Sequence, residues 1–200
     1  NAFLQGAHKR TKIIVVKQKG ALERTLHETT IHELLVDEVR TMSSKDVLSM
    51  NYWLMKTEPS EFSIDDLKRV KREPWSGVRN YQARNYMMKD MKVDDGIFFY
   101  HSNTTIPGIS GLAEVACDSY PDPTQFNKKS DYYDAASTLE NPRWWLVDVS
   151  FKRKFKRIIS LDELKHQAEH LETFTLLNRG NRLSILPVNA QQWKFILALE

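Results

Sequence analysis

The most informative part of this sequence runs Trp75-Ser76-Gly77-Val78-Arg79-Asn80-Tyr81-Gln82-Ala83-Arg84-Asn85. It places aromatic rings, guanidinium groups and carboxamides around a single glycine, more stacking and hydrogen-bonding capacity than a loop before a helix needs. Asn80 is a suitable N-cap, so we expect a helix from Tyr81 to Met91. Planar polar groups beside aromatic rings suit a flat ligand rich in heteroatoms, such as a nucleobase. The alternative is a capped helix with Trp75 in the core and solvated arginines.

Further motifs flank this stretch in a recognisable order. They are Trp53-Leu54-Met55-Lys56-Thr57-Glu58-Pro59, Phe98-Phe99-Tyr100-His101-Ser102-Asn103, Pro107-Gly108-Ile109-Ser110-Gly111, Tyr120-Pro121-Asp122-Pro123-Thr124-Gln125-Phe126 and Arg182-Leu183-Ser184. Together with the central stretch, the series over residues 52–199 resembles the EVE domain of the PUA-like superfamily, and within it the thymocyte nuclear protein family and its bacterial relatives. The resemblance implies a PUA-like β-barrel.

The pattern of apolar residues and turn signals predicts an α+β domain over residues 50–200. Strands are expected at 52–56, 97–101, 108–117, 145–151 and 182–186, with Pro187 ending the last one. Short helices are expected after the N-caps Ser63, Asn80, Ser160 and Asn189. About five or six strands with short surrounding helices fit the barrel that the resemblance implies. Residues 120–142 form a long polar loop, and such loops are usually functional or mobile.

Residues 1–49 lie outside the resemblance and are expected to form an N-terminal extension. The run at 12–16 is typical of a short strand, and apolar residues over 22–39 recur at roughly helical spacing. Met50 directly precedes the first expected strand and is a candidate native start, which would make the upstream segment an artefact rather than part of the native protein. The alternative, which we favour, is a weakly attached appendage.

The charge of the chain is small and unevenly distributed. Of the 29 Lys and Arg residues eight lie in 1–49, as do six of the 26 Asp and Glu residues, which leaves a net charge of +1 on residues 50–200. A near-neutral domain does not bind polyanions in general, so a shaped pocket must do much of the selecting. The basic run at 151–157 is either a solvated face or a rail for phosphates. Candidate phosphate-binding residues are Arg84, Lys152, Arg153, Lys154, Lys156 and Arg157.

Motifs for catalysis are missing. Gly108-Ile109-Ser110-Gly111 falls one residue short of a nucleophile elbow, and no glycine-rich phosphate loop occurs. His166 and His170 are spaced to share a metal, but exposed helical polar residues explain them as well. Cys117 is the single cysteine. We therefore expect a monomer that is not an enzyme, with no cofactor, no metal and no membrane span. We also expect it to be soluble and intracellular, cytoplasmic in a bacterium or nuclear in a eukaryote.

Fourteen residues of the motifs are candidates for binding a base: Trp53, Lys56, Glu58, Trp75, Arg79, Asn80, Tyr81, Gln82, Asn85, Tyr100, His101, Ser102, Asn103 and Asp122. The aromatic rings can sandwich a base, and a carboxylate can accept from the exocyclic amine of cytosine. The carboxamides and hydroxyl can read its edge, while the cations suit phosphates or a carbonyl oxygen. Alternatives remain open. Trp53 and Tyr100 fit a strand core, Arg79 can pair with Asp122 or Glu58, and His101 can be structural.

The resemblance implies recognition of a modified base, in particular modified cytosine in DNA, flipped into an aromatic and polar pocket. We therefore expect a non-catalytic nucleic-acid-binding module. One alternative is a modified-RNA reader of the same fold, for which the 2′-hydroxyl would set the preference. The other is a small-molecule enzyme or sensor that uses the same cavity, with His101 or Glu58 as acid or base.

Overall fold

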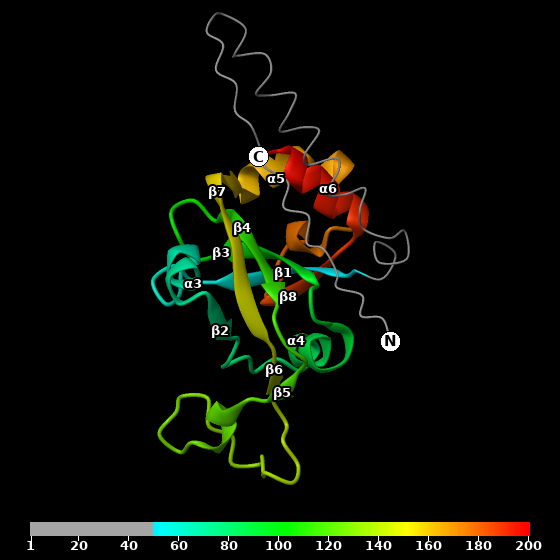
Figure 1. The fold of residues 1–200 in the computed structure, drawn as a ribbon. Helices are drawn as coiled ribbons and strands as arrows, with labels where there is room; N and C mark the ends of the chain where they lie inside the picture. Colours follow the sequence, from blue (N-terminus) through cyan, green and yellow to red (C-terminus); the bar gives the residue numbers. More distant parts are fainter. Residues whose placement is uncertain (1–49) are drawn as a thin grey trace, which may run out of the picture. The chain divides into compact units, whose positions relative to one another are not determined.

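The computed structural model describes residues 50–200, which form an α+β domain around one curled, mixed sheet of six strands (Figure 1). In order across the sheet the strands are β2 (Arg72–Pro74), β7 (Asp148–Ser160), β4 (Gly108–Val115), β3 (Gly96–His101), β1 (Tyr52–Thr57) and β8 (Ile185–Val188). Within this sheet β1 and β3 pair in parallel, and the other neighbours pair antiparallel. The expected fold class is confirmed; the strand and helix expected within 1–49 lie outside the described residues.

Short helices and a small second sheet complete the domain. The helices are α3 (Ile64–Val70), α4 (Tyr81–Asn85), α5 (Leu161–His166) and α6 (Ala190–Ala198), with single helical turns η1 (Tyr86–Asp90), η2 (Pro123–Phe126), η3 (Ala168–His170) and η4 (Thr175–Leu177). The small sheet pairs β5 (Tyr120–Pro121) with β6 (Trp145–Leu146). In Figure 1 α5 and α6 lie at one end of the domain, and the long loop between β5 and β6 lies at the other.

The expected N-caps are confirmed, because each satisfies backbone amides at the start of its helix. Asn80 accepts from the amides of Gln82 and Ala83, and α4 continues into η1, which closes before Met91. Ser63 and Asn189 each form a reciprocal capping box. Local side-chain chemistry therefore fixes where these helices begin.

Two of the expected strands differ from those observed. The strand expected at 145–151 is interrupted at Val147, and its second part, β7, continues through the basic run to Ser160. The last strand begins at Ile185 rather than residue 182 and contains Pro187, which was expected to end it. β8 lies at an edge of the sheet, where a proline removes no ladder hydrogen bond that the sheet needs.

Strand alternation divides the core into two clusters on opposite faces of the sheet. On β3, Ile97 and Phe99 join the cluster that contains Trp53 and Trp75. Phe98 and Tyr100 join the other cluster, which contains Leu54 and residues of α5 and α6. Side chains next to each other on β1 or β3 therefore face different parts of the molecule.

A buried carboxylate fastens the long loop to the segment before α4. Asp122 accepts hydrogen bonds from the Gly77 amide at 3.0 Å and from Nη1 of Arg79 at 2.8 Å. It also accepts from the amide and hydroxyl of Thr124 at 2.8 and 2.6 Å. Burial alone would raise the pKa of Asp122, but these hydrogen bonds outweigh it and hold the pKa below its usual value.

Replacing Asp122 with Asn should destabilise the protein in a pH-dependent way. The variant leaves Arg79 without its partner charge, so the free energy of unfolding at pH 7 should fall by about 3 kcal/mol. Because the native pKa lies below the unfolded value of about 3.9, the carboxylate stabilises the fold above pH 4 and loses this contribution as the pH falls through the native pKa.

Urea unfolding at pH 7 and at several lower pH values measures this difference between Asp122→Asn and the unchanged protein. The difference should shrink below about pH 4. Asp118→Asn is the matched control, because Asp118 is exposed and its loss of charge should change little. An Asp122→Asn difference that stays constant with pH would show that the charge does not stabilise the loop.

Candidate nucleic-acid interface

Trp53 is a core residue, which leaves its ring no open face for a ligand. Its side chain is 4% exposed, and its indole nitrogen donates to Asp95 at 2.9 Å. Its ring also packs against Tyr86 with centroids 5.3 Å apart. The structure thus favours the alternative considered for this residue, a strand position in the core.

Trp75 forms part of a cavity of about 290 Å³, which we call the Trp75 cavity. The lining residues come from β1, the turn before α3, β2 and the long loop: Thr57, Glu61, Phe62, Glu73, Pro74, Trp75, Ser76 and Tyr132. Trp75 is 9% exposed and belongs to the core cluster, as the alternative considered for it expected. It meets Phe99 edge to face at 5.8 Å, which fixes its ring. The cavity therefore combines a fixed indole with two further aromatic rings, Phe62 and Tyr132.

Polar groups also line the Trp75 cavity. The Thr57 hydroxyl donates to the Phe62 carbonyl at 3.1 Å, which leaves its oxygen able to accept. Glu61 and Glu73 line the same cavity, and within residues 50–200 their carboxylates make no hydrogen bond or ion pair. A ligand with an amino group would thus find an uncommitted acceptor beside the rings.

Tyr132 reaches the cavity from the long loop by resting on Gly77. A Cβ at Gly77 would lie 2.7 Å from the Tyr132 ring, and the φ of +81° also favours glycine there. The Tyr132 carbonyl accepts from Nε of Arg79 at 3.0 Å. The single glycine of the central stretch therefore has a specific role, because it allows the ring of Tyr132 to approach.

Most of the central stretch after Gly77 is engaged within the protein. Arg79 bonds to Asp122 and lies over the rings of Tyr132 and Trp144, at 5.4 and 5.3 Å. The Asn80 oxygen caps α4, and Tyr81 stacks on Trp144 at 4.9 Å.

Of the last three candidates of this stretch, two make hydrogen bonds within the protein and the third has a buried side-chain oxygen. Gln82 donates to the Tyr86 hydroxyl at 2.8 Å, and Arg84 donates to the Arg143 carbonyl at 2.6 Å. The Asn85 oxygen is buried without a hydrogen-bond partner. None of residues 79–85 lines the Trp75 cavity, so the stretch mainly supports the long loop.

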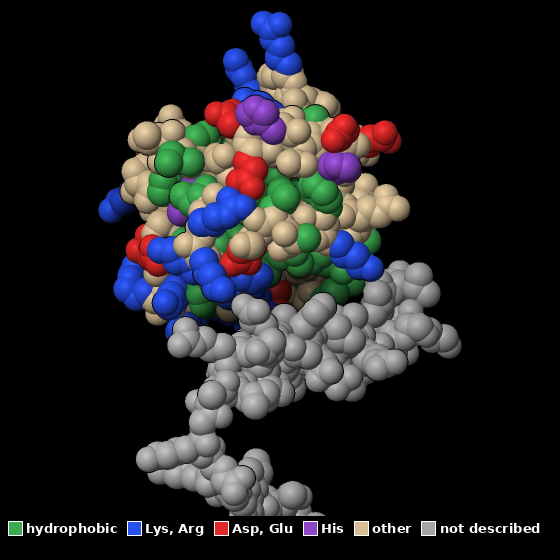
Figure 2. All heavy atoms as spheres, turned by 90° about the horizontal axis from the view of Figure 1, so that it is seen from above, with side chains coloured by type: hydrophobic (Ala, Val, Ile, Leu, Met, Phe, Trp, Pro, Cys, Tyr) green, Lys and Arg blue, Asp and Glu red, His purple; other side chains and the backbone are tan. Residues whose placement is uncertain are grey.

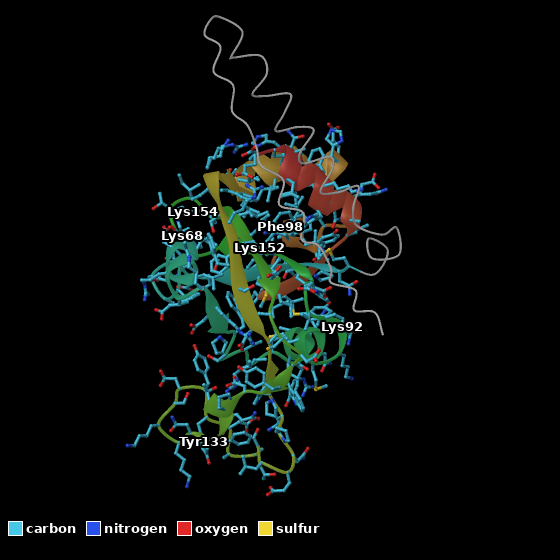
Figure 3. The ribbon with its side chains drawn as sticks, in the orientation of Figure 1. Lys68, Lys92, Phe98, Tyr133, Lys152 and Lys154 are labelled. Carbon is cyan, nitrogen blue, oxygen red and sulfur yellow. The ribbon has the colours of Figure 1, made fainter. Side chains whose placement is uncertain are left out.

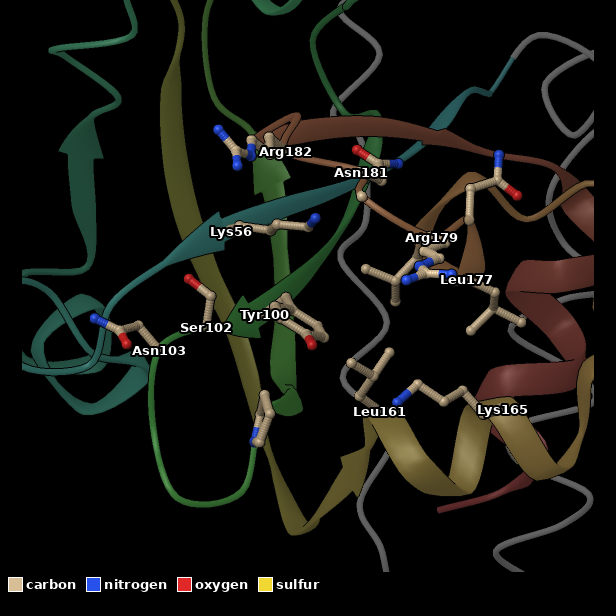
Figure 4. A pocket seen from close by; sticks show the side chains of 14 residues that line it. Lys56, Tyr100, Ser102, Asn103, Leu161, Lys165, Leu177, Arg179, Asn181 and Arg182 are labelled. Atoms are coloured by element: carbon tan, nitrogen blue, oxygen red, sulfur yellow. The ribbon is translucent and has the colours of Figure 1, made fainter.

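A second cavity, of about 570 Å³, lies on the opposite face of β1 and β3 (Figure 4). We call it the Lys56 cavity, and four predicted residues line it: Lys56, Tyr100, Ser102 and Asn103. Burial lowers the pKa of Lys56, and burial with a smaller contribution from Asp162 raises the pKa of Tyr100 to about 12. Asn103 donates to Glu58 at 2.9 Å, which engages that carboxylate.

His101 lines neither of these two cavities but a smaller one of about 170 Å³, together with Ile64, Asp65 and Ser110. Its Nε2 accepts from the Ile64 amide at 3.1 Å, so that nitrogen carries no proton. Burial lowers the pKa of His101, with a smaller opposing effect from Asp65. A buried, neutral imidazole that accepts a backbone hydrogen bond fits the structural role considered for it.

Carboxylates neutralise most of the predicted phosphate-binding run on β7. Lys152 pairs with Glu114 at 2.8 Å, Lys154 with Asp65 at 2.7 Å and Arg157 with Glu163 at 2.6 Å, and Arg153 pairs with Glu200. Figure 3 shows Lys152 and Lys154 on this strand, and Figure 2 shows acidic side chains interspersed among the Lys and Arg side chains. A phosphate would have to compete with a carboxylate at each of these four cations.

Several cavity residues were not predicted from the sequence. Phe62 and Tyr132 supply rings, Glu73 supplies a carboxylate, and Lys165 and Arg179 line the Lys56 cavity. The one available signal was the long loop that carries Tyr132. Within residues 50–200 no cluster of three His, Cys, Asp or Glu residues could hold a metal, and no helix is long and apolar enough to cross a membrane.

Comparison with known proteins identifies relatives along nearly all of the described domain. The EVE domain family model matches residues 51–199. Thymocyte nuclear protein 1 of Rattus norvegicus is 47% identical over 168 residues, which cover 75% of this chain and 74% of the relative. The Homo sapiens protein of the same name is 43% identical over 181 residues, which cover 80% of each chain.

Solved structures agree with the sequence relatives. A protein from Pseudomonas syringae has a TM-score of 0.71 at 48% identity and covers 74% of this chain and 98% of its own. The human THYN1 protein in complex with 5-methylcytosine-containing DNA has a TM-score of 0.70 at 42% identity, and the match covers 74% of this chain and 96% of that one. The family resemblance seen in the motifs is confirmed, and this chain belongs to the EVE domain family.

Proposed function

We propose that this protein is a non-catalytic reader of modified cytosine in DNA, which takes the base out of the duplex and into the Trp75 cavity. The observation that carries the proposal is a cavity that joins three aromatic rings to two carboxylates without partners among the described residues. The relative crystallised with 5-methylcytosine-containing DNA supports the choice of ligand.

The energetics explain why both rings and carboxylates are needed. Extruding a base costs a few kcal/mol, and stacking on aromatic side chains returns roughly 1–3 kcal/mol per base. Stacking therefore about offsets extrusion, and polar contacts must supply the selectivity. We assign Glu73 as the acceptor for the exocyclic amine of cytosine, because it is half-buried beside Trp75 whereas Glu61 is exposed.

The methyl group adds a modest preference of its own. Phe62 and Pro74 give the cavity apolar surface against which a methyl can pack. Burying one such group contributes about 0.8 kcal/mol, which is roughly a fourfold preference over unmodified cytosine. Larger discrimination would require the amine contact and the fit of the ring as well.

The alternatives have less support. An enzyme would need His101 or Glu58 beside the ligand. Instead, Nε2 of His101 accepts a hydrogen bond from the Ile64 amide, and the Glu58 carboxylate accepts one from Asn103. An RNA reader of the same fold would need a contact to the 2′-hydroxyl. The DNA complex of the human relative favours DNA over RNA.

Removing the Tyr132 ring should weaken binding to every base that enters the cavity. Fluorescence anisotropy of labelled duplexes with one 5-methylcytosine should show Tyr132→Ala binding about 5- to 150-fold more weakly, the equivalent of one lost stacking contact. Tyr132 is 47% exposed, so the variant should remain folded.

The matched control is Tyr133→Ala, since Tyr133 is also exposed on the long loop but does not line the cavity (Figure 3). Unmodified DNA and RNA of the same sequence complete the series. Of these three ligands, the unchanged protein should bind methylated DNA with the highest affinity. Equal losses in both tyrosine variants, or no preference for methylated DNA, would contradict the proposal.

Replacing Glu73 with Gln should relax discrimination between 5-methylcytosine and thymine, which share the methyl group and differ in the amine or carbonyl at position 4. A Gln amide can donate to that carbonyl, whereas a carboxylate cannot. The ratio of the two dissociation constants should fall by about tenfold, within the range for one specific base contact.

Glu61→Gln removes the same charge from the rim of the same cavity and serves as its control. The cost of extruding each base from its own duplex is the same for all proteins and cancels in the comparison. If the ratio of the two dissociation constants changes equally in Glu73→Gln and Glu61→Gln, the effect comes from charge alone. Glu73 would then not be the acceptor for the exocyclic amine.

A further inference from the structure

The Lys56 cavity concentrates positive charge, most of which has no counter-ion among the described residues. Four cations line it, Lys56, Lys165, Arg179 and Arg182, and its lining holds no Asp or Glu. Lys165 pairs with Asp162 at 3.0 Å, but among residues 50–200 no carboxylate lies within ion-pair distance of the other three. This differs from the β7 run, where four cations each have an acidic partner.

The cavity also has polar donors and an apolar floor. Three carboxamides line it, those of Asn103, Asn178 and Asn181, together with the leucines Leu161, Leu176 and Leu177. Figure 4 shows Lys56 extending from β1 toward the segment that carries Arg179 and Asn181. Cations with amide donors suit a phosphate, and the leucines suit an apolar group attached to it, such as a sugar.

Lys56 is a partly buried cation in the cavity, and an anion beside it would stabilise its charged form. Its side chain is half-buried, and burial lowers the pKa of its ammonium group. An anion beside it would favour the charged form and offset this effect. Arg179 and Arg182 are exposed at the rim, and a guanidinium group can bind a phosphate through two hydrogen bonds.

The two cavities lie on either side of the same strand ends. Lys56 and Thr57 are consecutive residues of β1, so their side chains face opposite sides of the sheet, one toward each cavity. Ser102 and Asn103 follow β3 directly and line the Lys56 cavity. A nucleic-acid strand that inserts a base on one side would have to cross these strand ends to reach the other.

We propose that the Lys56 cavity binds a backbone phosphate, with its sugar, of the DNA strand whose modified base enters the Trp75 cavity. This inference rests on the proposed function. It assigns the phosphate contacts to Arg179, Arg182 and Lys56 in place of the basic run on β7.

The salt dependence of binding tests this assignment. Each phosphate contact contributes about −0.9 to the slope of log K against log salt for duplex DNA. Arg179→Gln combined with Arg182→Gln should flatten the slope by about 1 to 2 and leave the preference for methylated cytosine unchanged. Lys152→Gln combined with Lys154→Gln removes the same charge from β7 and should leave the slope nearly as it was.

Single neutral methylphosphonates near the 5-methylcytosine locate the contact. At one or two positions the substitution should weaken binding by the unchanged protein and by the β7 double variant, and should weaken binding by the Arg179/Arg182 double variant, which keeps only Lys56, clearly less. If the penalty is undiminished in that variant while methylated DNA is still preferred, the phosphate assignment is wrong and the proposed function stands. If the unchanged protein shows no preference for methylated DNA, the proposed function fails, whatever the slopes.

Discussion

The parallel pairing of β1 with β3 aligns Lys56 with Tyr100 and Thr57 with His101. Side chains alternate along each strand. In this register, alternate side chains of β1 and β3 therefore face Trp75, and the others face α5 and α6. A shift of one residue would exchange the two faces and put Lys56 in the aromatic cluster. Both cavities, and their position on either side of the same strand ends, follow from this pairing.

The second constraint is the attachment of the long loop. A ring on a loop of more than 20 residues has no fixed place unless something holds the loop. Asp122 and Arg79 supply that link, and Gly77 leaves room for Tyr132 to settle over the turn. The polar groups of the central stretch thus shape the Trp75 cavity indirectly, by positioning the loop that forms one of its walls.

Local features of this fold were predictable from sequence, and long-range ones were not. The caps at Ser63, Asn80 and Asn189 involve neighbours within three residues, so the sequence predicts them well. Whether Trp53 faces a ligand or the core depends on its contact with Asp95, 42 positions away.

The ion pairs of the basic run on β7 are also long-range contacts that the sequence does not predict. Lys154 pairs with Asp65, which lies 89 positions away, so a basic run that contains no acidic residue in the sequence is neutralised by carboxylates from elsewhere in the fold. Conversely, Lys56, Arg179 and Arg182 are scattered in sequence and converge on one cavity. Motif order was enough to recognise the EVE domain, but the sorting of its residues into two cavities required the sheet register.

The central claim is that the modified base leaves the duplex and enters the protein. Imino-proton NMR tests it on a short duplex with one 5-methylcytosine paired to guanine. When saturating protein is added, the imino resonance of that guanine should be lost through exchange with water while those of the neighbouring pairs persist, because only the partner of an extruded base is left unpaired. Persistence of that resonance at saturation would show that the protein reads the base within the helix, and would contradict the account.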